Sequence, residues 1–247
     1  MKKHVPNLVT CLNVTCGAAA VFLAMRGRVF EAGALVLLAM VFDLFDGLLA
    51  RWLGASSALG RELDSLADAV SFGVAPALLA HALLLDALGE EAAGWWGALA
   101  YLPVMIPAFS IYRLASFNLD TRQTHAFIGM PTPAHALFWV SLLFSRRYAP
   151  GLHEAVWGSP WVLSGCVVLF SALLVSGLPM FSLKFVSFGW RANCWCYSYA
   201  LLALLLLLLV GVGAVSFLVP LYAGVAVAGV LVRGPGCSRR SRDGARR

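Results

Sequence analysis

Four aspartates lie in one short stretch of this chain, and they are the residues with the clearest chemical potential. They are Asp43, Asp46, Asp64 and Asp68, out of only seven aspartates among 247 residues. Apolar runs border the stretch on both sides, so the carboxylates would repel one another at a membrane boundary unless a cation compensates their charge. The stretch therefore predicts a cation site.

The spacing of the acids arranges them in two pairs, each on one face of a helix. Asp43 and Asp46 are three residues apart, and Asp64 and Asp68 are four apart. A tight connection would make the two helices antiparallel neighbours. Ligand sets made only of oxygen select Mg²⁺, Mn²⁺ or Ca²⁺ over zinc or copper. Four carboxylates can bridge two such ions, an arrangement that stabilises the attacking and leaving oxygens in displacement at phosphorus.

Two residues beside the first pair suit a phosphate-bearing substrate. Gly47 removes a side chain where a substrate must approach closely, and Arg51, one turn further on, offers a fork of donors to a phosphate. One alternative is that the acids only pair with Arg51 or Arg61 at a wet helix boundary. Another is a cation or substrate transporter whose carboxylates relay protons or bind the transported ion.

The composition places these residues in a membrane protein. Hydrophobic residues make up 61% of the chain and charged residues 12%, and the mean hydropathy is +0.84. Globular domains are about a quarter charged. Apolar runs of about 20 residues predict an all-α, polytopic bundle of transmembrane helices rather than a barrel. In such a chain the net charge of +6 reports orientation and attraction to anionic membrane lipids, so no nucleic-acid partner is expected.

The apolar runs divide the chain into a six-helix catalytic core (residues 1–195), additional C-terminal membrane helices (196–232) and a basic, disordered tail (233–247). The core spans are expected at residues 8–25, 29–50, 63–85, 95–117, 130–144 and 160–180, with a loop at 182–195. The last apolar run is much longer than one span requires. We expect it to form two helices that meet near Gly211 to Ser216, with one long helix kinked at Pro220 as the alternative.

The distribution of lysine and arginine predicts the orientation. With eight spans and the N-terminus inside, fourteen of these residues fall on the inner side and four on the outer side. Because basic loop residues are enriched on the cytoplasmic side, both termini and the acid-bearing helix ends are expected to face the cytoplasm. We therefore expect an integral protein of the cytoplasmic (inner) membrane of a prokaryote.

The acids belong to a longer pattern, D-x2-D-G-x2-A-R-x8-G-x3-D-x3-D, which runs from Asp43 to Asp68. This pattern resembles the signature of the CDP-alcohol phosphotransferases, and every defined position is matched. The resemblance implies a reaction in which a CDP-linked lipid passes its phosphatidyl group to an alcohol and releases CMP. It also implies two divalent cations, Mg²⁺ or Mn²⁺, and a homodimer.

Further blocks resemble the branch of the family that uses L-serine as the acceptor and CDP-diacylglycerol as the donor. These blocks are Val5-Pro6-Asn7 with Thr10 and Asn13, Glu62 to Pro76, Arg113-Leu-Ala with Phe117-Asn118, and Gly129 to Ala134. The resemblance covers about residues 1–140. Acceptor choice lies outside the shared pattern, so a sister enzyme that uses glycerol phosphate or inositol phosphate remains the alternative.

The resemblance also implies roles for individual residues. Asp43, Asp46, Asp64 and Asp68 would hold the metals, and Asp68 would also take the proton from the serine hydroxyl. The CDP-lipid would be bound by Asn7, Thr10, Gly47, Arg51, Ser57 and Gly60. Arg113 and Asn118 would contact serine or phosphate. In one place the chain departs from the family, because Ser116 stands where a second basic residue is usual.

Overall fold

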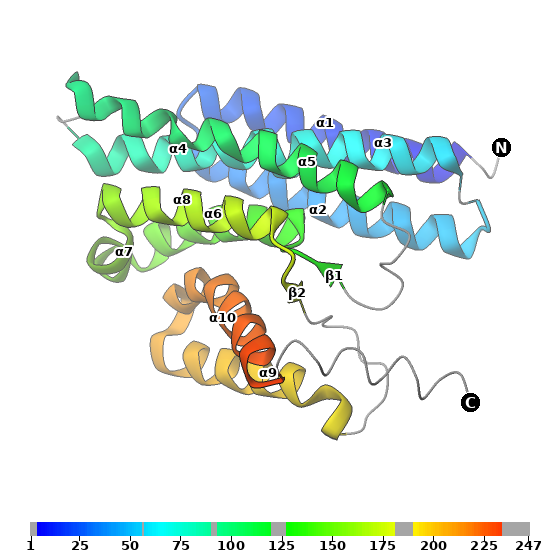
Figure 1. The fold of residues 1–247 in the computed structure, drawn as a ribbon. Helices are drawn as coiled ribbons and strands as arrows, with labels where there is room; N and C mark the ends of the chain where they lie inside the picture. Colours follow the sequence, from blue (N-terminus) through cyan, green and yellow to red (C-terminus); the bar gives the residue numbers. More distant parts are fainter. Residues whose placement is uncertain (1–3, 56, 90–92, 120–126, 181–189, 234–247) are drawn as a thin grey trace.

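The computed structural model describes residues 4–55, 57–89, 93–119, 127–180 and 190–233, and these are almost entirely helical (Figure 1). The helices are α1 (Val5–Met25), α2 (Val29–Trp52), α3 (Ala58–Asp68), α4 (Ala75–Leu88), α5 (Met105–Leu119), α6 (Thr132–Tyr148), α7 (Pro150–Trp157), α8 (Pro160–Val175), α9 (Trp190–Val210) and α10 (Val215–Arg233). A π-helical turn, η2 (Ala69–Val74), joins α3 to α4. Two 3₁₀ segments, η4 (Trp95–Val104) and η5 (Gly211–Ala214), precede α5 and α10.

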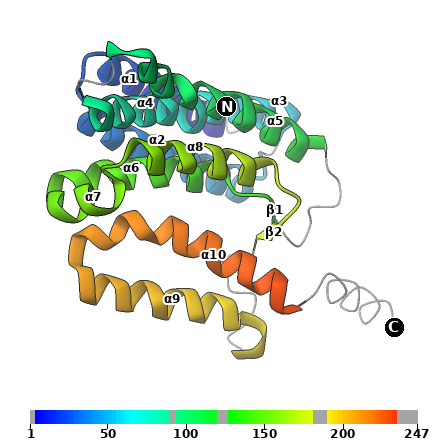
Figure 2. The same ribbon diagram turned by 60° about the vertical axis from the view of Figure 1, so that its left-hand side comes forward.

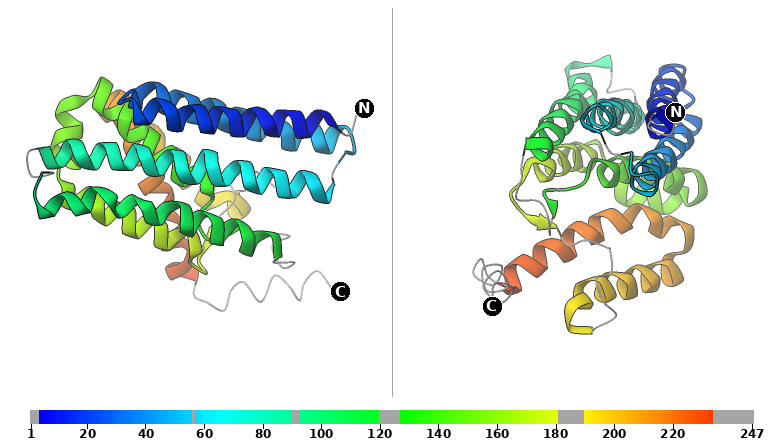
Figure 3. Two further views of the ribbon diagram at one scale, coloured as in Figure 1. Left: turned by 90° about the horizontal axis from the view of Figure 1, so that it is seen from above. Right: turned by 90° about the vertical axis from the view of Figure 1, so that its right-hand side faces the viewer.

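The first half of the bundle is a set of long helices that reverse direction at short turns. Gly27 has a φ of 74°, a conformation that favours glycine, and lets α2 fold back along α1. Gly54, with a φ of 58°, serves the turn after α2. Seen from above, α1, α2, the continuous α3–η2–α4 and α5 run side by side (Figure 3).

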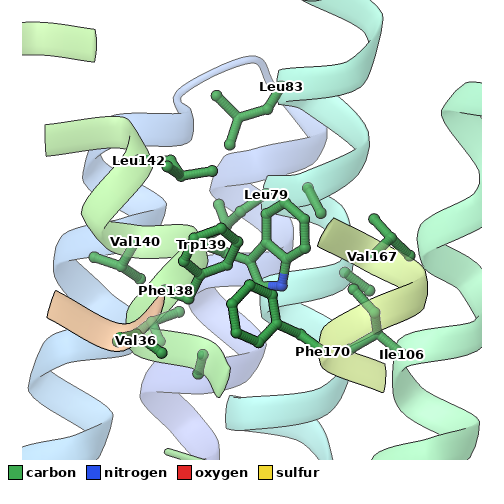
Figure 4. Close-up of a cluster of buried hydrophobic side chains, with 14 of the residues drawn as sticks. Val36, Leu79, Leu83, Ile106, Phe138, Trp139, Val140, Leu142, Val167 and Phe170 are labelled. Carbon is green, nitrogen blue, oxygen red and sulfur yellow. The ribbon is translucent and has the colours of Figure 1, made fainter. Parts of the chain in front are cut away.

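The core of the bundle is built around aromatic side chains of α6. Trp139 and Phe138 have no exposed surface, and the ring of Phe138 lies 5.0 Å from that of Trp139 and 4.4 Å from that of Phe170 on α8. Leu79 of α4 and Val36 of α2 pack around them (Figure 4). This cluster joins α2, α4, α6 and α8 and so fixes the frame on which the acid-bearing ends are held.

A small β clip ties two distant segments together at one end of the core. β1 (Phe127–Ile128) pairs antiparallel with β2 (Pro179–Met180). The clip continues in two backbone bonds, from Gly129 N–H to the Leu178 carbonyl and from Met130 N–H to the Leu173 carbonyl, both 2.9 Å long. The N-terminus of α6 is therefore anchored to the C-terminal end of α8.

The C-terminal helices form a hairpin on one side of the core. α10 packs on α6, and α9 contacts α10 and η5 (Figure 2). When the core helices are viewed end-on, α9 and α10 are seen in profile, so the hairpin crosses the core at a steep angle (Figure 3). Trp157 on α7 holds the hairpin, since its Nε1 donates to Ser216 Oγ at 3.1 Å and its ring lies 5.3 Å from that of Phe217.

The predicted class, an all-α polytopic membrane protein, is confirmed. Among the described residues, five helices are long and apolar enough to cross a membrane, or six if α7 and α8, bent by 74°, form one span. The predicted division of the last apolar run is also confirmed, since η5 separates α9 from α10 at Gly211–Ala214. The expected disordered tail lies outside the described residues apart from Arg233, which ends α10.

Two predicted boundaries were wrong, and one short helix was not predicted. The helix expected from residue 63 begins at Ala58, because Ser57 caps it by accepting a hydrogen bond from Gly60 N–H at 3.0 Å. The loop expected up to residue 195 ends earlier, since α9 begins at Trp190. The short helix α7 was not predicted, because its eight residues include glycine, histidine and glutamate and are typical of a loop between spans.

Candidate active site

The four acids come from the C-terminal half of α2 and from α3. Single ligand atoms of Asp43, Asp64 and Asp68 all lie within 4.8 Å of one another. Asp46, one turn after Asp43, is not part of this group and is instead bonded to α1. The structure thus brings together three of the four predicted ligands and places the fourth beside them.

The two helices that carry the acids are neighbours. α2 packs against η2 and α4 of the continuous helix that begins with α3, and α1 packs against both α2 and α3. The prediction that the two acid-bearing helices would be neighbours is therefore confirmed. The prediction did not include α1, which packs against both of them.

Polar residues of α1 bind the acids directly. Thr10 Oγ1 lies 2.6 Å from Asp46 Oδ2 and 3.2 Å from the Pro6 carbonyl, and Asn13 Nδ2 donates to Asp68 Oδ1 at 3.3 Å. Thr10 and Asn13 are three residues apart and therefore share one helical face. The Thr10 hydroxyl, predicted as a contact to the CDP-lipid, thus already has a carboxylate partner within the protein.

The remaining predicted nucleotide-side residues gather near the start of α3. A Cβ atom added at Gly60 would lie 3.1 Å from Ser57 Oγ and 3.2 Å from Asn7 Oδ1, so Gly60 lies close to both side chains. A Cβ at Gly47 would meet nothing within 4 Å. Gly47 therefore borders open space, which agrees with a role in close substrate approach but is not required by packing within the chain.

The alternative in which arginines neutralise the acids finds no support in the described residues. Arg51 and Arg61 are both exposed. The ion pairs found there are Arg28 with Glu31, at 3.1 Å, and Arg146 with Asp86, at 2.7 Å, and neither involves the acid cluster. Among the described residues, the clustered carboxylates therefore form no salt bridge with a basic side chain.

The arrangement fits divalent cations. Its ligands are carboxylate oxygens, which Mg²⁺ and Mn²⁺ prefer. Asp64 Oδ1 is buried without a hydrogen-bond partner among the described residues, which is costly for a carboxylate unless a cation takes the place of a donor. Bound there, divalent cations would neutralise charge that develops on phosphate oxygens. Asp43, Asp64 and Asp68 are the residues placed to hold such an ion, with Asp46 adjacent.

A buried arginine lies within electrostatic range of Asp68. Arg113 of α5 is 8% exposed, its Nε has no hydrogen-bond partner among the described residues, and it interacts electrostatically with Asp68. Its guanidinium carbon lies 5.9 Å from the centre of the Phe117 ring. A buried guanidinium with an unused donor is suited to an anionic group of a substrate.

The other predicted acceptor residue has a structural partner. Asn118 Nδ2 donates to Ser65 Oγ at 2.8 Å, and the Ser65 hydroxyl lies 3.1 Å from the Arg61 carbonyl. The end of α5 is thereby tied to α3 next to Asp64. Ser116 is exposed on α5.

Sequence reasoning missed three features of the site. Asn13 was named in a block that resembles the family but was not assigned to the acids, because its partner Asp68 is 55 residues away. Ser65 carries no signal in its residue type. The π-helical turn that begins directly after Asp68 has no periodic signature, although such turns are frequent at functional sites.

Comparison with known proteins identifies the family. The sequence model of the CDP-alcohol phosphatidyltransferase family matches residues 3–232. The chain is 38% identical over 189 residues to a CDP-diacylglycerol–serine O-phosphatidyltransferase of Mycobacterium tuberculosis, an alignment that covers 74% of this chain. It is 37% identical over 142 residues to the Bacillus subtilis protein of the same name, covering 58% of this chain and 76% of the relative.

A more distant archaeal relative is also similar. The chain is 29% identical over 174 residues to an archaetidylserine synthase of Methanothermobacter thermautotrophicus, covering 68% of this chain and 67% of the relative. The chain spans only 62% of the length of the M. tuberculosis relative. Since the family match covers nearly the whole chain and includes the acid cluster, the chain belongs to the CDP-alcohol phosphatidyltransferase family.

Proposed function

We propose that this membrane protein transfers the phosphatidyl group of CDP-diacylglycerol to the hydroxyl of L-serine, giving phosphatidylserine and CMP. The observation that carries the proposal is the cluster of Asp43, Asp64 and Asp68 within 4.8 Å, with the buried Arg113 in electrostatic range of Asp68. The names of the bacterial relatives support serine as the acceptor.

The reaction is a single displacement at phosphorus. The serine hydroxyl oxygen forms a bond to the phosphorus next to diacylglycerol, and the bond from that phosphorus to the oxygen of CMP breaks. Asp68 accepts the hydroxyl proton, and the electron pair of the broken bond leaves with CMP. No nucleophile of the protein is needed, and the acyl chains can remain in the bilayer throughout.

We assign the substrate contacts to two sides of the acid cluster. Asn7, Thr10, Gly47, Arg51, Ser57 and Gly60 are the CDP-lipid side. The closeness of Gly60 to both Asn7 and Ser57 and the open space at Gly47 support this assignment. Arg113 binds the serine carboxylate or a phosphate oxygen through its free donors, and Asn118 positions α3 through Ser65.

The metals are proposed to be two Mg²⁺ or Mn²⁺ ions held by the four aspartates. The absence of a salt bridge to these carboxylates, among the described residues, supports this ligand set. Asp46, held by Thr10, would reach the second ion.

The deciding experiment supplies purified protein with CDP-diacylglycerol, Mn²⁺ or Mg²⁺, and a panel of alcohols. Serine is expected to give phosphatidylserine with stoichiometric release of CMP. A second candidate is transfer to glycerol phosphate or inositol phosphate, which is favoured by Ser116 at a position where the family usually carries a base. Product from one of those acceptors but none from serine would overturn the assignment of serine.

We further propose that the site faces the cytoplasm from the inner membrane and that the chain works as a homodimer. The excess of basic residues on the inner side supports the orientation. Externally added water-soluble serine should be consumed by inverted vesicles and not by sealed right-side-out vesicles. The mass of the detergent-solubilised protein, corrected for bound detergent, should equal two chains.

A further inference from the structure

Asn13 is a buried amide that is bonded to the proposed base, Asp68. It has no exposed surface, and its Nδ2 donates to Asp68 Oδ1 at 3.3 Å. Asp68 is itself 7% exposed, and no second hydrogen bond to its carboxylate is found among the described residues. One oxygen of Asp68 is thus bound by α1 while the other is unbonded.

The position of Asn13 is fixed by the π-helical turn that follows Asp68. Ser71, in the middle of this turn, donates from its hydroxyl to the Asn13 backbone carbonyl at 3.1 Å. Gly17, one turn along α1, permits this approach, since a Cβ there would lie 2.7 Å from the Ser71 Cα. The contact therefore depends on a glycine on one helix and on a widened turn in the other.

The bonding of Asn13 is unusual for an amide whose role is only structural. Its Oδ1 is buried and has no partner among the described residues, so the side chain is satisfied only at Asp68. Burying an unpaired polar group costs about 1–3 kcal/mol. If Asn13 served only packing, an apolar side chain of similar shape would be more stable at this position. The bond from Asn13 to Asp68 therefore points to a role in the reaction.

We propose that Asn13 is a positioning residue for Asp68, held in place by Ser71. Its amide fixes the carboxylate through Oδ1 and directs the other oxygen toward the incoming hydroxyl. Partners that orient a catalytic or metal-binding side chain typically affect affinity or activity by 10–100-fold. This inference rests on the proposed function, in which Asp68 takes the proton.

The test uses two variants that remove the amide donor. Asn13→Asp keeps the size of the side chain, and Asn13→Leu makes it apolar. Both are expected to lower kcat by about 10–100-fold while the KM for CDP-diacylglycerol stays within about twofold. Thr15→Val is the matched control, because Thr15 lies on the same helix and its hydroxyl bonds only to the Cys11 carbonyl, at 2.7 Å. It should leave both constants unchanged.

Two further measurements separate positioning from a structural role. The electron paramagnetic resonance spectrum of bound Mn²⁺ should change in both Asn13 variants and not in Thr15→Val. In an Asp68→Asn background, adding Asn13→Leu should lower the residual rate by less than about twofold, because the group it positions is already gone. If Asn13→Leu fails to fold, Ser71→Ala takes its place and should show the same pattern with a smaller loss.

The inference is overturned by wild-type kcat in the Asn13 variants, by a raised KM with unchanged kcat, or by additive losses in the Asp68→Asn background. An unchanged Mn²⁺ spectrum also contradicts it. Each outcome is measured relative to the wild-type protein, with whichever acceptor alcohol gives CMP release. They are therefore distinct from failure of the serine assignment, which would appear in wild type alone.

Discussion

The chemistry of single residues converges at Asp68. Its carboxylate meets an amide from α1 and two acids from α2 and α3, and Arg113 of α5 lies within electrostatic range. The sequence predicted the acid set because the spacing of carboxylates has a direct chemical meaning. It did not predict Asn13 as a partner, since an asparagine on an apolar helix gains its role only from the residue that faces it.

Asp68→Asn should lower turnover at least 100-fold and leave binding of the CDP-lipid measurable. The amide keeps the shape of the side chain but cannot accept the hydroxyl proton, and general-base catalysis typically contributes 10²–10⁴-fold. Turnover is measured as CMP release. Asp86→Asn is the matched control, since Asp86 forms an exposed ion pair with Arg146 and is not part of the acid cluster, and it should keep wild-type turnover. Wild-type turnover in Asp68→Asn would exclude the base assignment.

Arg113→Lys should raise the KM for serine by about tenfold, or about 1.4 kcal/mol of binding free energy. Lysine keeps the charge but loses the planar fork of donors that matches a carboxylate. Steady-state kinetics with varied serine provides the measurement, and Arg146→Lys serves as the control because Arg146 pairs with Asp86 away from the cluster. A serine KM equal to wild type would show that Arg113 does not bind the acceptor.

At the scale of elements, the helices that carry the acids were predictable, but the way in which α1 packs against them was not. Apolar runs of sufficient length predicted α1, α2 and the continuous helix through α4, because crossing the lipid requires that length. The close packing of α1 on the continuous helix involves Gly17 and the π-helical turn, and this local fit has no periodic signature in the sequence. The steep crossing of α9–α10 depends on Trp157, whose contacts no periodic pattern reveals.

The β clip continues into Gly129, and replacing this glycine is expected to destabilise the fold through two separate effects. Gly129 has a φ of 77°, and an added Cβ would lie 2.6 Å from the Leu174 carbonyl oxygen. Gly129→Ala should therefore lower the thermal unfolding midpoint in detergent through both backbone strain and steric conflict, each worth about 1–2 kcal/mol.

Gly27→Ala provides the matched comparison for the clip. Gly27 has a φ of 74°, but a Cβ there would meet nothing within 4 Å, so this variant carries the strain alone. Its unfolding midpoint should fall by less than that of Gly129→Ala. Equal shifts in the two variants would show that contact with α8 adds nothing to stability.

For the whole molecule, removal of divalent cations should abolish CMP release. Treatment with EDTA leaves the carboxylates of Asp43, Asp64 and Asp68 uncompensated and removes the charge that stabilises the phosphates. Adding back Mn²⁺ or Mg²⁺ in excess of the chelator should restore the rate. Undiminished release in EDTA would contradict a metal-dependent reaction.

The order in which the residues of the site occur along the chain has a consequence for biosynthesis. Every residue found to touch the carboxylates through a hydrogen bond, and all four acids themselves, lie within the first 68 positions, whereas Arg113 comes much later. Because chains emerge from the ribosome N-terminus first, the acids enter the membrane before α5 exists. The hydrogen bonds from Thr10 to Asp46 and from Asn13 to Asp68 therefore join residues that are all synthesised before Arg113.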